Sequence, residues 1–362
     1  MPKWLRTLLV PLAVLALVAA ACGDDPAEPG DGSAAPECDA DISVGVAYDI
    51  GGIGDKSFND AANAGLIAAI DEGLVCEENT DSLEPDATGS NRDDNLIALA
   101  DAGHDLVVAV GFAFSPGINE SAGDYADTQF AVIDGYATCG TACGLTNDGL
   151  TNVTDLTFKE HEGSFLVGAA AATKADADGC TTVGFLGGQT GPLIEKFQAG
   201  FEAGVAHVND GIEVLVQYIG DDVTAFNDAV KGEALSTGMY DDGACIIYHA
   251  AGASGAGLFN AAVAADKLAI GVDSDQYLLV SAEQQPLIMT SMLKRVDTAV
   301  HDAIEQVGDG SLEAGGQVFG MAEGGVDYSK SNTELMTDDI ITLLDDLKAQ
   351  IIAGDIVVPE AP

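Results

Sequence analysis

Positively charged side chains are scarce in this chain of 362 residues. It has 13 lysines and arginines against 59 aspartates and glutamates, which gives a formal net charge of −46 at pH 7. Such a surface repels nucleic acids and anionic membrane faces, so neither is expected as a partner. It also disfavours a phosphorylated or carboxylate ligand unless the site itself is basic. We interpret most of the excess acid as a solvated coat, because net charge governs solubility rather than fold.

Motifs of the common enzyme classes are also missing. The five histidines form no H-E-x-x-H pair, the glycines at 51–54 lack the G-x-G-x-x-G spacing of a dinucleotide site, and no P-loop is present for ATP hydrolysis. Ser291 and Lys294 match S-x-x-K, but the S-D-N and K-T-G motifs that accompany it in penicillin-recognising enzymes do not occur. A secreted hydrolase using this pair is therefore a minor alternative. The sequence predicts no enzyme activity, no catalytic residue, no cofactor and no metal.

Residues 1–21 have the features of a secretory signal peptide. Lys3 and Arg6 give a basic start, an apolar stretch follows, and small residues lead directly to Cys22. We predict a bacterial lipoprotein signal with Cys22 lipidated as the mature N-terminus; an ordinary secretory peptide is the alternative. Residues 22–40 form an acidic tether with few large apolar side chains. The protein is therefore expected at the cell membrane, on its extracytoplasmic side, held by the lipid anchor alone.

Six of the seven cysteines lie beyond Cys22, and an even number in an exported chain indicates disulfide bonds. Cysteines at the starts of strands, or on both sides of a short loop, are placed to meet. The predicted bonds are Cys38–Cys76, Cys139–Cys143 and Cys180–Cys245. A zinc site fits less well, because the cysteines are dispersed and no paired His-Cys spacing accompanies them.

From residue 42 onward, apolar runs typical of buried parallel strands alternate with helical patterns. The first half predicts strands at 42–48, 105–111, 129–135 and 152–158, and helices at 58–70, 95–102 and 162–173. The second half predicts strands at 182–187, 214–219, 245–249 and 268–272, and helices at 193–208, 225–236 and 252–265. A strand at 287–292 and helices at 296–307 and 333–353 follow, with a Gly-rich segment at 314–325.

Two successive α/β units of similar length predict two doubly wound parallel-sheet lobes with a hinge and a ligand cleft between them. We assign residues 41–159 and about 277–325 to lobe one, and residues 160–276 and about 326–362 to lobe two. Ligands bind beyond the C-terminal ends of parallel strands. The candidates are the residues that follow the strands: the stretch 49–59, Phe112, Asp134, Phe226, Gly252, Asp273 and Asp275.

The stretch DIGGIGDKSFN at 49–59 joins the first strand to the first helix. A strand, a glycine-rich turn and a helix start together make a ligand-facing corner in an α/β protein. Asp55 and Lys56 can pair with each other, or Asp55 can cap the helix, because an acid is favourable at a helix N-terminus. From the residues alone, Phe58 is equally a member of the apolar stripe of the helix and a ring that faces a ligand.

Many segments, in order and over residues 42–359, resemble the basic membrane protein family, the substrate-binding lipoproteins of nucleoside ABC transporters. They include DIGGIGDKSFNDAANAGL at 49–66, EGSFLVGAAAA at 162–172, AFNDAVKGEALS at 225–236, YHAAGASGAG at 248–257, IGVDSDQ at 270–276 and TSMLKRVD at 290–297. The resemblance implies a type I periplasmic-binding-protein fold and a purine nucleoside receptor-like role. The implied partners are a nucleoside, usually a purine, and the ABC permease and ATPase subunits, with the binding protein itself a monomer.

By this resemblance, Phe58 and Phe226 sandwich the nucleobase from opposite lobes. Stacking of this kind contributes about 1–3 kcal/mol per base and tolerates different bases. Asp49, Asn59 and Asp134 would read the edge of the base or help to seat the nucleoside, because carboxylates accept hydrogen bonds and an amide both donates and accepts them.

Asp273 resembles the aspartate of the family that accepts hydrogen bonds from two ribose hydroxyls, with Asp275 as the runner-up. Lys294 resembles the lysine that completes the ribose site, although a salt bridge to one of many acids would also explain it. Gly252 would let the backbone approach the ligand closely. Phe197 is an alternative for the stacking ring, but it lies inside a predicted helix and is more consistent with the core. A surface lipoprotein of the same fold that acts in signalling, or one that binds a flavin or thiamine-like heterocycle, remains an alternative.

Overall fold

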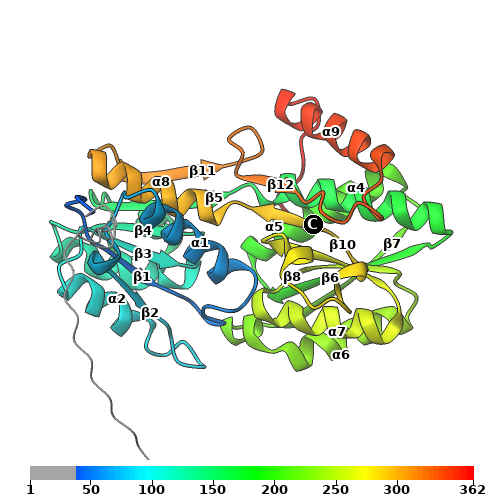
Figure 1. Cartoon of the computed structure of the whole chain (residues 1–362), viewed down its shortest axis with the longest axis horizontal. Helices are drawn as coiled ribbons and strands as arrows, with labels where there is room; N and C mark the ends of the chain where they lie inside the picture. Colours follow the sequence, from blue (N-terminus) through cyan, green and yellow to red (C-terminus); the bar gives the residue numbers. More distant parts are fainter. Residues whose placement is uncertain (1–37) are drawn as a thin grey trace, which may run out of the picture. The chain divides into compact units, whose positions relative to one another are not determined.

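Two six-stranded sheets organise residues 38–362, the part of the chain that the computed structural model describes (Figure 1). The predicted signal peptide, the predicted lipidation site Cys22 and nearly all of the predicted tether lie outside the described residues. Within residues 38–362, no helix is both long enough and apolar enough to cross a membrane.

The first sheet has the strand order β11-β5-β4-β3-β1-β2, and all of its strands run parallel. Its strands are β1 (Val44–Ala47), β2 (Thr80–Leu83), β3 (Leu106–Val110), β4 (Gln129–Ile133), β5 (Val153–Phe158) and β11 (Gly315–Phe319). The helices of this lobe are α1 (Phe58–Asp71), α2 (Arg92–Asp101), α3 (Ser115–Ser121) and α8 (Val296–Asp309), of which α8 packs on α1.

The second sheet has the order β12-β10-β9-β8-β6-β7, and only β12 runs antiparallel to its neighbour. Its strands are β6 (Thr182–Gln189), β7 (Glu213–Gly220), β8 (Ile246–Ala250), β9 (Leu268–Asp273), β10 (Ile288–Lys294) and β12 (Val326–Tyr328). The helices of this lobe are α4 (Glu160–Asp178), α5 (Pro192–Val208), α6 (Ala229–Asp241), α7 (Gly255–Ala265) and α9 (Asp338–Ala353).

The two sheets repeat one topology. In each, the first strand lies between the second and the third, and the fourth and fifth follow in line. The central strands β3 and β8 are buried along their whole length, which explains why both appear in the sequence as continuous apolar runs. Equivalent strands therefore end at equivalent places in the two lobes.

Over residues 38–362 the chain passes between the lobes three times, from β5 to α4, from β10 to α8 and from β11 to β12. The second passage corrects the boundary expected near residue 277. Strand β10 pairs with β9 and β12 in the second sheet, so the chain returns to the first lobe only after Lys294. The Gly-rich segment at 314–325 also contains a strand, β11, which extends the first sheet beside β5.

Two predicted helices are shorter or divided. The predicted helix at 333–353 begins at Asp338, because the side chain of Thr337 accepts a hydrogen bond from the backbone N–H of Ile340 and caps the first turn. The predicted helix at 225–236 is a short 3-10 segment, Val223–Asn227, followed by α6. The side chain of Asp228 caps α6 by accepting a hydrogen bond from the backbone N–H of Lys231.

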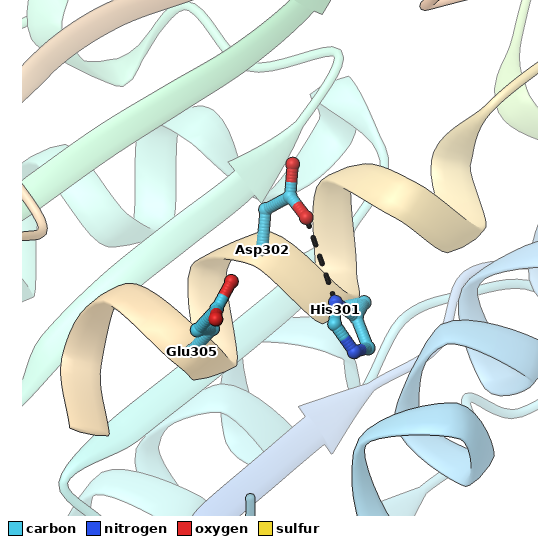
Figure 2. A group of neighbouring side chains, drawn as sticks. All are labelled: His301, Asp302 and Glu305. Carbon is cyan, nitrogen blue, oxygen red and sulfur yellow. Dashed lines mark hydrogen bonds and ion pairs between the residues drawn. The ribbon is translucent and has the colours of Figure 1, made fainter. Parts of the chain in front are cut away.

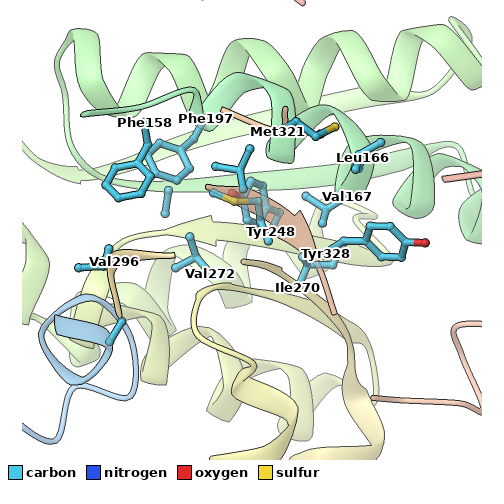
Figure 3. Close-up of a cluster of buried hydrophobic side chains, with 14 of the residues drawn as sticks. Phe158, Leu166, Val167, Phe197, Tyr248, Ile270, Val272, Val296, Met321 and Tyr328 are labelled. Atoms are coloured by element: carbon cyan, nitrogen blue, oxygen red, sulfur yellow. The ribbon is translucent and has the colours of Figure 1, made fainter. Parts of the chain in front are cut away.

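A continuous cluster of buried apolar side chains joins the two lobes. Figure 3 shows the part of it in which α4 meets the second sheet, with Leu166 and Val167 on the helix and Tyr248, Ile270 and Val272 on the strands. These side chains are at most 1% exposed. The core therefore fixes the crossover helix α4 against the sheet whose strand ends face the first lobe.

Three disulfide bonds join the pairs expected from the sequence. Cys38–Cys76 ties the beginning of the described chain to the segment before β2, and Cys180–Cys245 joins the residues before β6 and β8. Cys139–Cys143 closes a short loop. The Cα atoms of the bonded pairs are 5.6, 5.6 and 6.5 Å apart, within the usual range.

Close packing of α4 on α5 leads to a stability prediction. A Cβ atom at Gly204 would run into the backbone carbonyl oxygen of Phe165, whereas a Cβ atom at Gly238, on the exposed side of α6, would meet no atom within 4 Å. We expect Gly204→Ala to lower the free energy of unfolding by about 1–3 kcal/mol, as overpacking does. Gly238→Ala should raise it by about 0.5–1 kcal/mol, because alanine is the better helix former. Urea denaturation of both variants measures this, and equal effects would contradict the packing argument.

Candidate functional site

The C-terminal ends of the parallel strands of both sheets border one cavity of about 70 Å³. All of the ligand-binding residues implied by the sequence lie on its wall. They are Asp49, Phe58, Asn59, Asp134, Phe226, Gly252, Asp273 and Lys294. Other lining residues include Ile50, Asp55, Phe112, Ile194 and Phe197. The runner-up Asp275 is not among the lining residues, and it accepts a hydrogen bond from the hydroxyl of Ser331 instead.

The glycine turn between β1 and α1 is fastened by its own polar side chains. Gly51, Gly52 and Gly54 have φ values of 104°, 60° and 103°, which side chains other than glycine rarely adopt. The carboxylate of Asp55 accepts hydrogen bonds from the backbone N–H groups at the start of α1, including that of Asn59 at 2.9 Å. Asp55 is therefore a cap of the helix.

Asn59 closes the other side of the turn. Its amide nitrogen donates to the carboxylate of Asp55 at 2.9 Å, and its amide oxygen accepts from the backbone N–H of Asp49 at 3.0 Å. The side chain is 1% exposed. Both hydrogen-bonding ends of the amide are thus engaged in shaping the turn, a role that the sequence did not indicate.

Asp49 is held by a residue that the sequence did not single out. Arg92, the first residue of α2, forms an ion pair with Oδ1 of Asp49, and its Nε donates to the same atom at 3.1 Å. The backbone N–H of Ile50 donates to it at 2.7 Å. Burial raises the pKa of Asp49, while Arg92 opposes the shift. With Oδ1 taken, Oδ2 is the oxygen of Asp49 left for other partners.

Asp134 and Asp273 occupy equivalent positions in the two lobes. Asp134 directly follows β4, and Asp273 ends β9, the corresponding strand of the second sheet. Both have left-handed backbones, with φ values of 59° and 62°, which is uncommon outside glycine. Strained backbone of this kind gathers at functional sites. The repeat therefore brings one buried carboxylate from each lobe to the cavity.

The ammonium of Lys294 lies between the lobes and is almost fully buried, with 2% of the side chain exposed. Its Nζ donates to Oδ2 of Asp134 at 2.6 Å and forms an ion pair with Glu160 at 3.5 Å. It also lies over the rings of Phe58, Phe158 and Phe197, at 5.0, 5.0 and 5.5 Å from their centroids.

The neighbouring carboxylates determine the charge state of this lysine. Burial alone would lower the pKa of Lys294, but Asp134, Glu160 and Asp273 outweigh it and raise the pKa above the ordinary value. In the opposite direction, burial raises the pKa of Asp273 to about 7, against the ammonium of Lys294 and a hydrogen bond from the hydroxyl of Ser57. Lys294 is therefore charged at neutral pH, whereas Asp273 is near the midpoint of its ionisation.

The aromatic wall differs in one respect from the expected pair. Phe226 faces the first lobe through Phe112, edge to face, with the ring centroids 6.4 Å apart. Gly188 leaves the space that the ring of Phe226 occupies, because a Cβ atom at this position would overlap the ring, whereas Gly252 lies against the backbone oxygen of Phe226. Phe58 contacts the ammonium of Lys294 from the other lobe. Phe112, which follows β3, and Phe197 of α5 are thus two further rings at the cavity.

The glycine turn also contacts the second lobe directly. The hydroxyl of Ser57 donates to Oδ2 of Asp273 at 2.5 Å, and the side-chain amide of Gln276 donates to the carbonyl oxygen of Lys56 at 3.0 Å. The hydroxyl of Ser274 donates to the carbonyl oxygen of Ser57 at 3.3 Å. The lobes are therefore closed on one another, which explains the small volume of the cavity.

A separate group of metal-ligand types lies on α8, where His301, Asp302 and Glu305 stand close together (Figure 2). None of the three lines the cavity. His301 already contacts Asp302 at 3.5 Å and Glu72, the residue directly after α1, at 3.2 Å, and Glu305 is exposed. We assign no metal-binding role to this group, because exposed acids gather readily on a chain with 59 of them.

Curated relatives match the chain along most of its length. The CD4+ T-cell-stimulating antigen of Listeria innocua is 31% identical over 99% of both chains. The ABC transporter nucleoside-binding protein BmpA of Lactococcus lactis is 29% identical over 88% of this chain and 89% of its own. Basic membrane protein A of Borreliella burgdorferi is 31% identical over 84% of each.

Solved structures share the fold. A crystal structure described as ABC transporter system solute-binding proteins from Aeropyrum pernix K1 is 28% identical, covers 88% of this chain and 94% of that one, and superposes with a TM-score of 0.72. A solute-binding protein from Conexibacter woesei superposes with a TM-score of 0.66 at 23% identity, covering 88% and 99% of the two chains. The expected periplasmic-binding-protein fold of two α/β lobes is confirmed.

The family whose sequence profile matches residues 42–361 is described as ABC transporter substrate-binding protein PnrA-like. The match spans both lobes and every residue that lines the cavity. It confirms the family resemblance, and it agrees with the absence of enzyme motifs from the sequence, since proteins of this family and fold bind solutes and are not enzymes. The chain therefore belongs to the PnrA-like family of ABC transporter substrate-binding proteins.

Proposed function

We propose that the protein binds a nucleoside, with a purine as the favoured base, in the cavity between its lobes and delivers it to an ABC permease. The observation that carries this proposal is the composition of the wall. Aromatic rings from both lobes border the same space as two strand-end carboxylates and a buried ammonium. A nucleoside has a flat base and a hydroxylated sugar, so it can use both kinds of surface.

The aromatic part of the wall suits the base. Phe58 enters from lobe one and Phe226 from lobe two, with Phe112 beside the latter. Closure of the lobes on a bound base would bring the first two rings to its faces. Because the cavity measures only about 70 Å³, we infer that the lobes separate to admit the ligand and close less tightly around it.

The polar part of the wall suits the sugar. A carboxylate can accept hydrogen bonds from two neighbouring hydroxyls, and the ammonium has three donors, of which Asp134 takes one. We assign the sugar to Asp273 and Lys294 on this basis. The carboxylates around the ammonium disfavour a phosphate group, so the proposed ligand is a nucleoside rather than a nucleotide.

We further infer that the protein is a lipoprotein anchored through Cys22 on the extracytoplasmic face of the cell membrane, with permease and ATPase subunits as partners. The relative from Lactococcus lactis named as a nucleoside-binding protein supports the ligand class. The three disulfide bonds support an exported protein, because such bonds persist in oxidising compartments.

Calorimetric titration with inosine, guanosine, adenosine, cytidine and uridine tests the ligand class and the aromatic slot together. We expect purine nucleosides to bind most tightly. Phe58→Leu keeps an apolar side chain but removes the stacking surface, so affinity should fall by about fivefold to 150-fold, the equivalent of about 1–3 kcal/mol. Phe259→Leu is the matched control, because Phe259 is buried in α7 and does not line the cavity. Failure of every nucleoside to bind would refute the proposal, and equal losses in the two variants would refute the slot.

The ionisation of Asp273 should make nucleoside affinity depend on pH. Burial raises its pKa to about 7, and the ionised carboxylate accepts hydrogen bonds from hydroxyls more strongly than the protonated carboxyl group does. We expect affinity to rise with pH through about 7 and then level off. In Asp273→Asn the affinity should be lower and should lack this rise. Titrations across that range decide the point, and an unchanged pH profile in the variant would exclude Asp273 as its cause.

Stability should change with pH in the opposite sense. The pKa of Asp273 is about 7 in the folded protein and near 3.8 when unfolded, so the folded state binds the extra proton between these values. The contribution of Asp273 to the free energy of unfolding is fully present below the pKa of the unfolded state and is lost as pH rises through about 7. Relative to Asp273→Asn, the wild type should lose up to about 1.4 kcal/mol per pH unit across this window, measured by denaturant unfolding.

Lipid attachment is tested by growth with an alkyne-labelled fatty acid. The wild-type protein should incorporate the label and sediment with membranes. Cys22→Ala should do neither, because the thiol is the proposed attachment atom, and the soluble variant should still bind nucleoside. Membrane association of Cys22→Ala equal to that of the wild type would contradict the anchor.

A further inference from the structure

We propose that Glu160 is a positioning residue of the ligand site, which holds the ammonium of Lys294 in the place where it meets the sugar hydroxyls of the ligand. The inference rests on the proposed function of the cavity and adds a residue to it. Glu160 does not line the cavity and is not expected to touch the ligand. It would act through Lys294.

The two residues stand at neighbouring passages of the chain between the lobes. Glu160 is the first residue of α4, directly after the passage from β5, and Lys294 is the last residue of β10, directly before the passage to α8. Their charged atoms are 3.5 Å apart. Because β10 also packs on α4, the ion pair ties together two elements that have to keep their relation when the lobes move.

The burial of Glu160 is hard to explain by stability alone. The side chain is 0% exposed, and among residues 38–362 neither of its carboxylate oxygens has a hydrogen-bond partner. In this part of the chain its only close cations are Lys294 and Lys196, each at 3.5 Å. Removing a carboxylate from water without hydrogen bonds is unfavourable, and a whole buried ion pair is often no more stabilising than well-packed apolar residues in its place. A role toward the ammonium explains why an acid stands here.

The remaining surroundings of Lys294 do not fix its direction. The rings of Phe58, Phe158 and Phe197 attract the ammonium at 5.0–5.5 Å, but this attraction tolerates displacement. Asp134 binds it directly at 2.6 Å, but from the other lobe, which has to move when the cavity opens. Glu160 and Asp273 both belong to the second lobe and stay near Lys294 when the lobes separate. Asp273 lines the cavity and is assigned to the ligand, whereas Glu160 forms an ion pair with the ammonium and does not line the cavity, so Glu160 is the acid free to hold the lysine in place in the open form as well as in the closed form.

Glu160→Gln tests this role, because it removes the charge and keeps the size. The measurement is calorimetric affinity for a purine nucleoside and for its free base, which lacks the sugar. We expect the nucleoside affinity of the variant to fall by about tenfold, typical of a lost charged partner, while the affinity for the free base changes by less than about twofold. A residue that only supports the fold would lower both affinities together.

Glu162→Gln is the matched control on the same turn of α4. Glu162 pairs with Lys159 at 3.2 Å and accepts from the backbone N–H of Met321 at 2.7 Å, so its loss should leave both affinities as in the wild type. The double variant that combines Glu160→Gln with Lys294→Met gives a second readout, which is needed if the free base binds too weakly to measure. Once Lys294 is gone, adding Glu160→Gln should cause no further loss of nucleoside affinity.

Each result has a distinct meaning. Unchanged nucleoside affinity in Glu160→Gln, equal losses for nucleoside and free base, or a full further loss on top of Lys294→Met would overturn the inference and leave the proposed function standing. If the wild type binds no nucleoside, the proposed function fails and the inference falls with it. If Glu160→Gln does not fold, Glu160→Asp replaces it, and the shorter carboxylate should produce the same split between the two ligands with a smaller loss.

Discussion

The buried ammonium of Lys294 is the charge that the closed arrangement depends on. A charge that is 2% exposed has to be compensated within the protein, because its loss of hydration is expensive. The compensation comes from Asp134 in lobe one and from Glu160 at a passage between the lobes. Because Asp134 comes from the other lobe, the charge of Lys294 is fully compensated only when the lobes close. Loss of either acid would leave an imperfectly paired buried charge, a change that typically destabilises proteins by about 3–5 kcal/mol.

The repeat of one topology explains why the site lies where it does. Parallel strands end at the same edge of a sheet, so two doubly wound sheets whose edges face one another enclose a cleft without any long loop. The equivalence extends to single residues, since Asp134 and Asp273 follow the corresponding strands with the same left-handed backbone. The two lobes are similar, but their equivalent aspartates have different partners in the site. Asp134 pairs with Lys294, whereas Asp273 receives only a hydroxyl donor, and its pKa is raised to about 7.

Much of this arrangement could be predicted from the sequence, because strands buried on both faces leave continuous apolar runs and the residues after them form the cleft. The points at which the chain passes from one lobe to the other were harder to predict. Whether Ile288–Lys294 joins the first or the second sheet depends on which sheet has a free edge beside it, and no local pattern records this. Strand β11 was missed because it opens with Gly315 and Gly316, and its residues alternate between partly buried and exposed, as on the edge of a sheet.

The polar residues that support the site left weaker signals than those that line it. An acid at the start of a helix, such as Glu160, is ordinarily explained by its favourable interaction with the helix dipole. The sequence contains 58 other acids, so Glu160 does not stand out among them. Only the tertiary structure separates a buried carboxylate from the solvated coat. Surface charges and buried carboxylates also act over different distances. Charges on the coat are screened beyond about 8–10 Å in physiological salt, whereas the buried carboxylates act on Lys294 with little screening. The strongly acidic surface and the balanced charge of the cavity are therefore independent properties, so changes in the coat should leave the chemistry of ligand recognition intact.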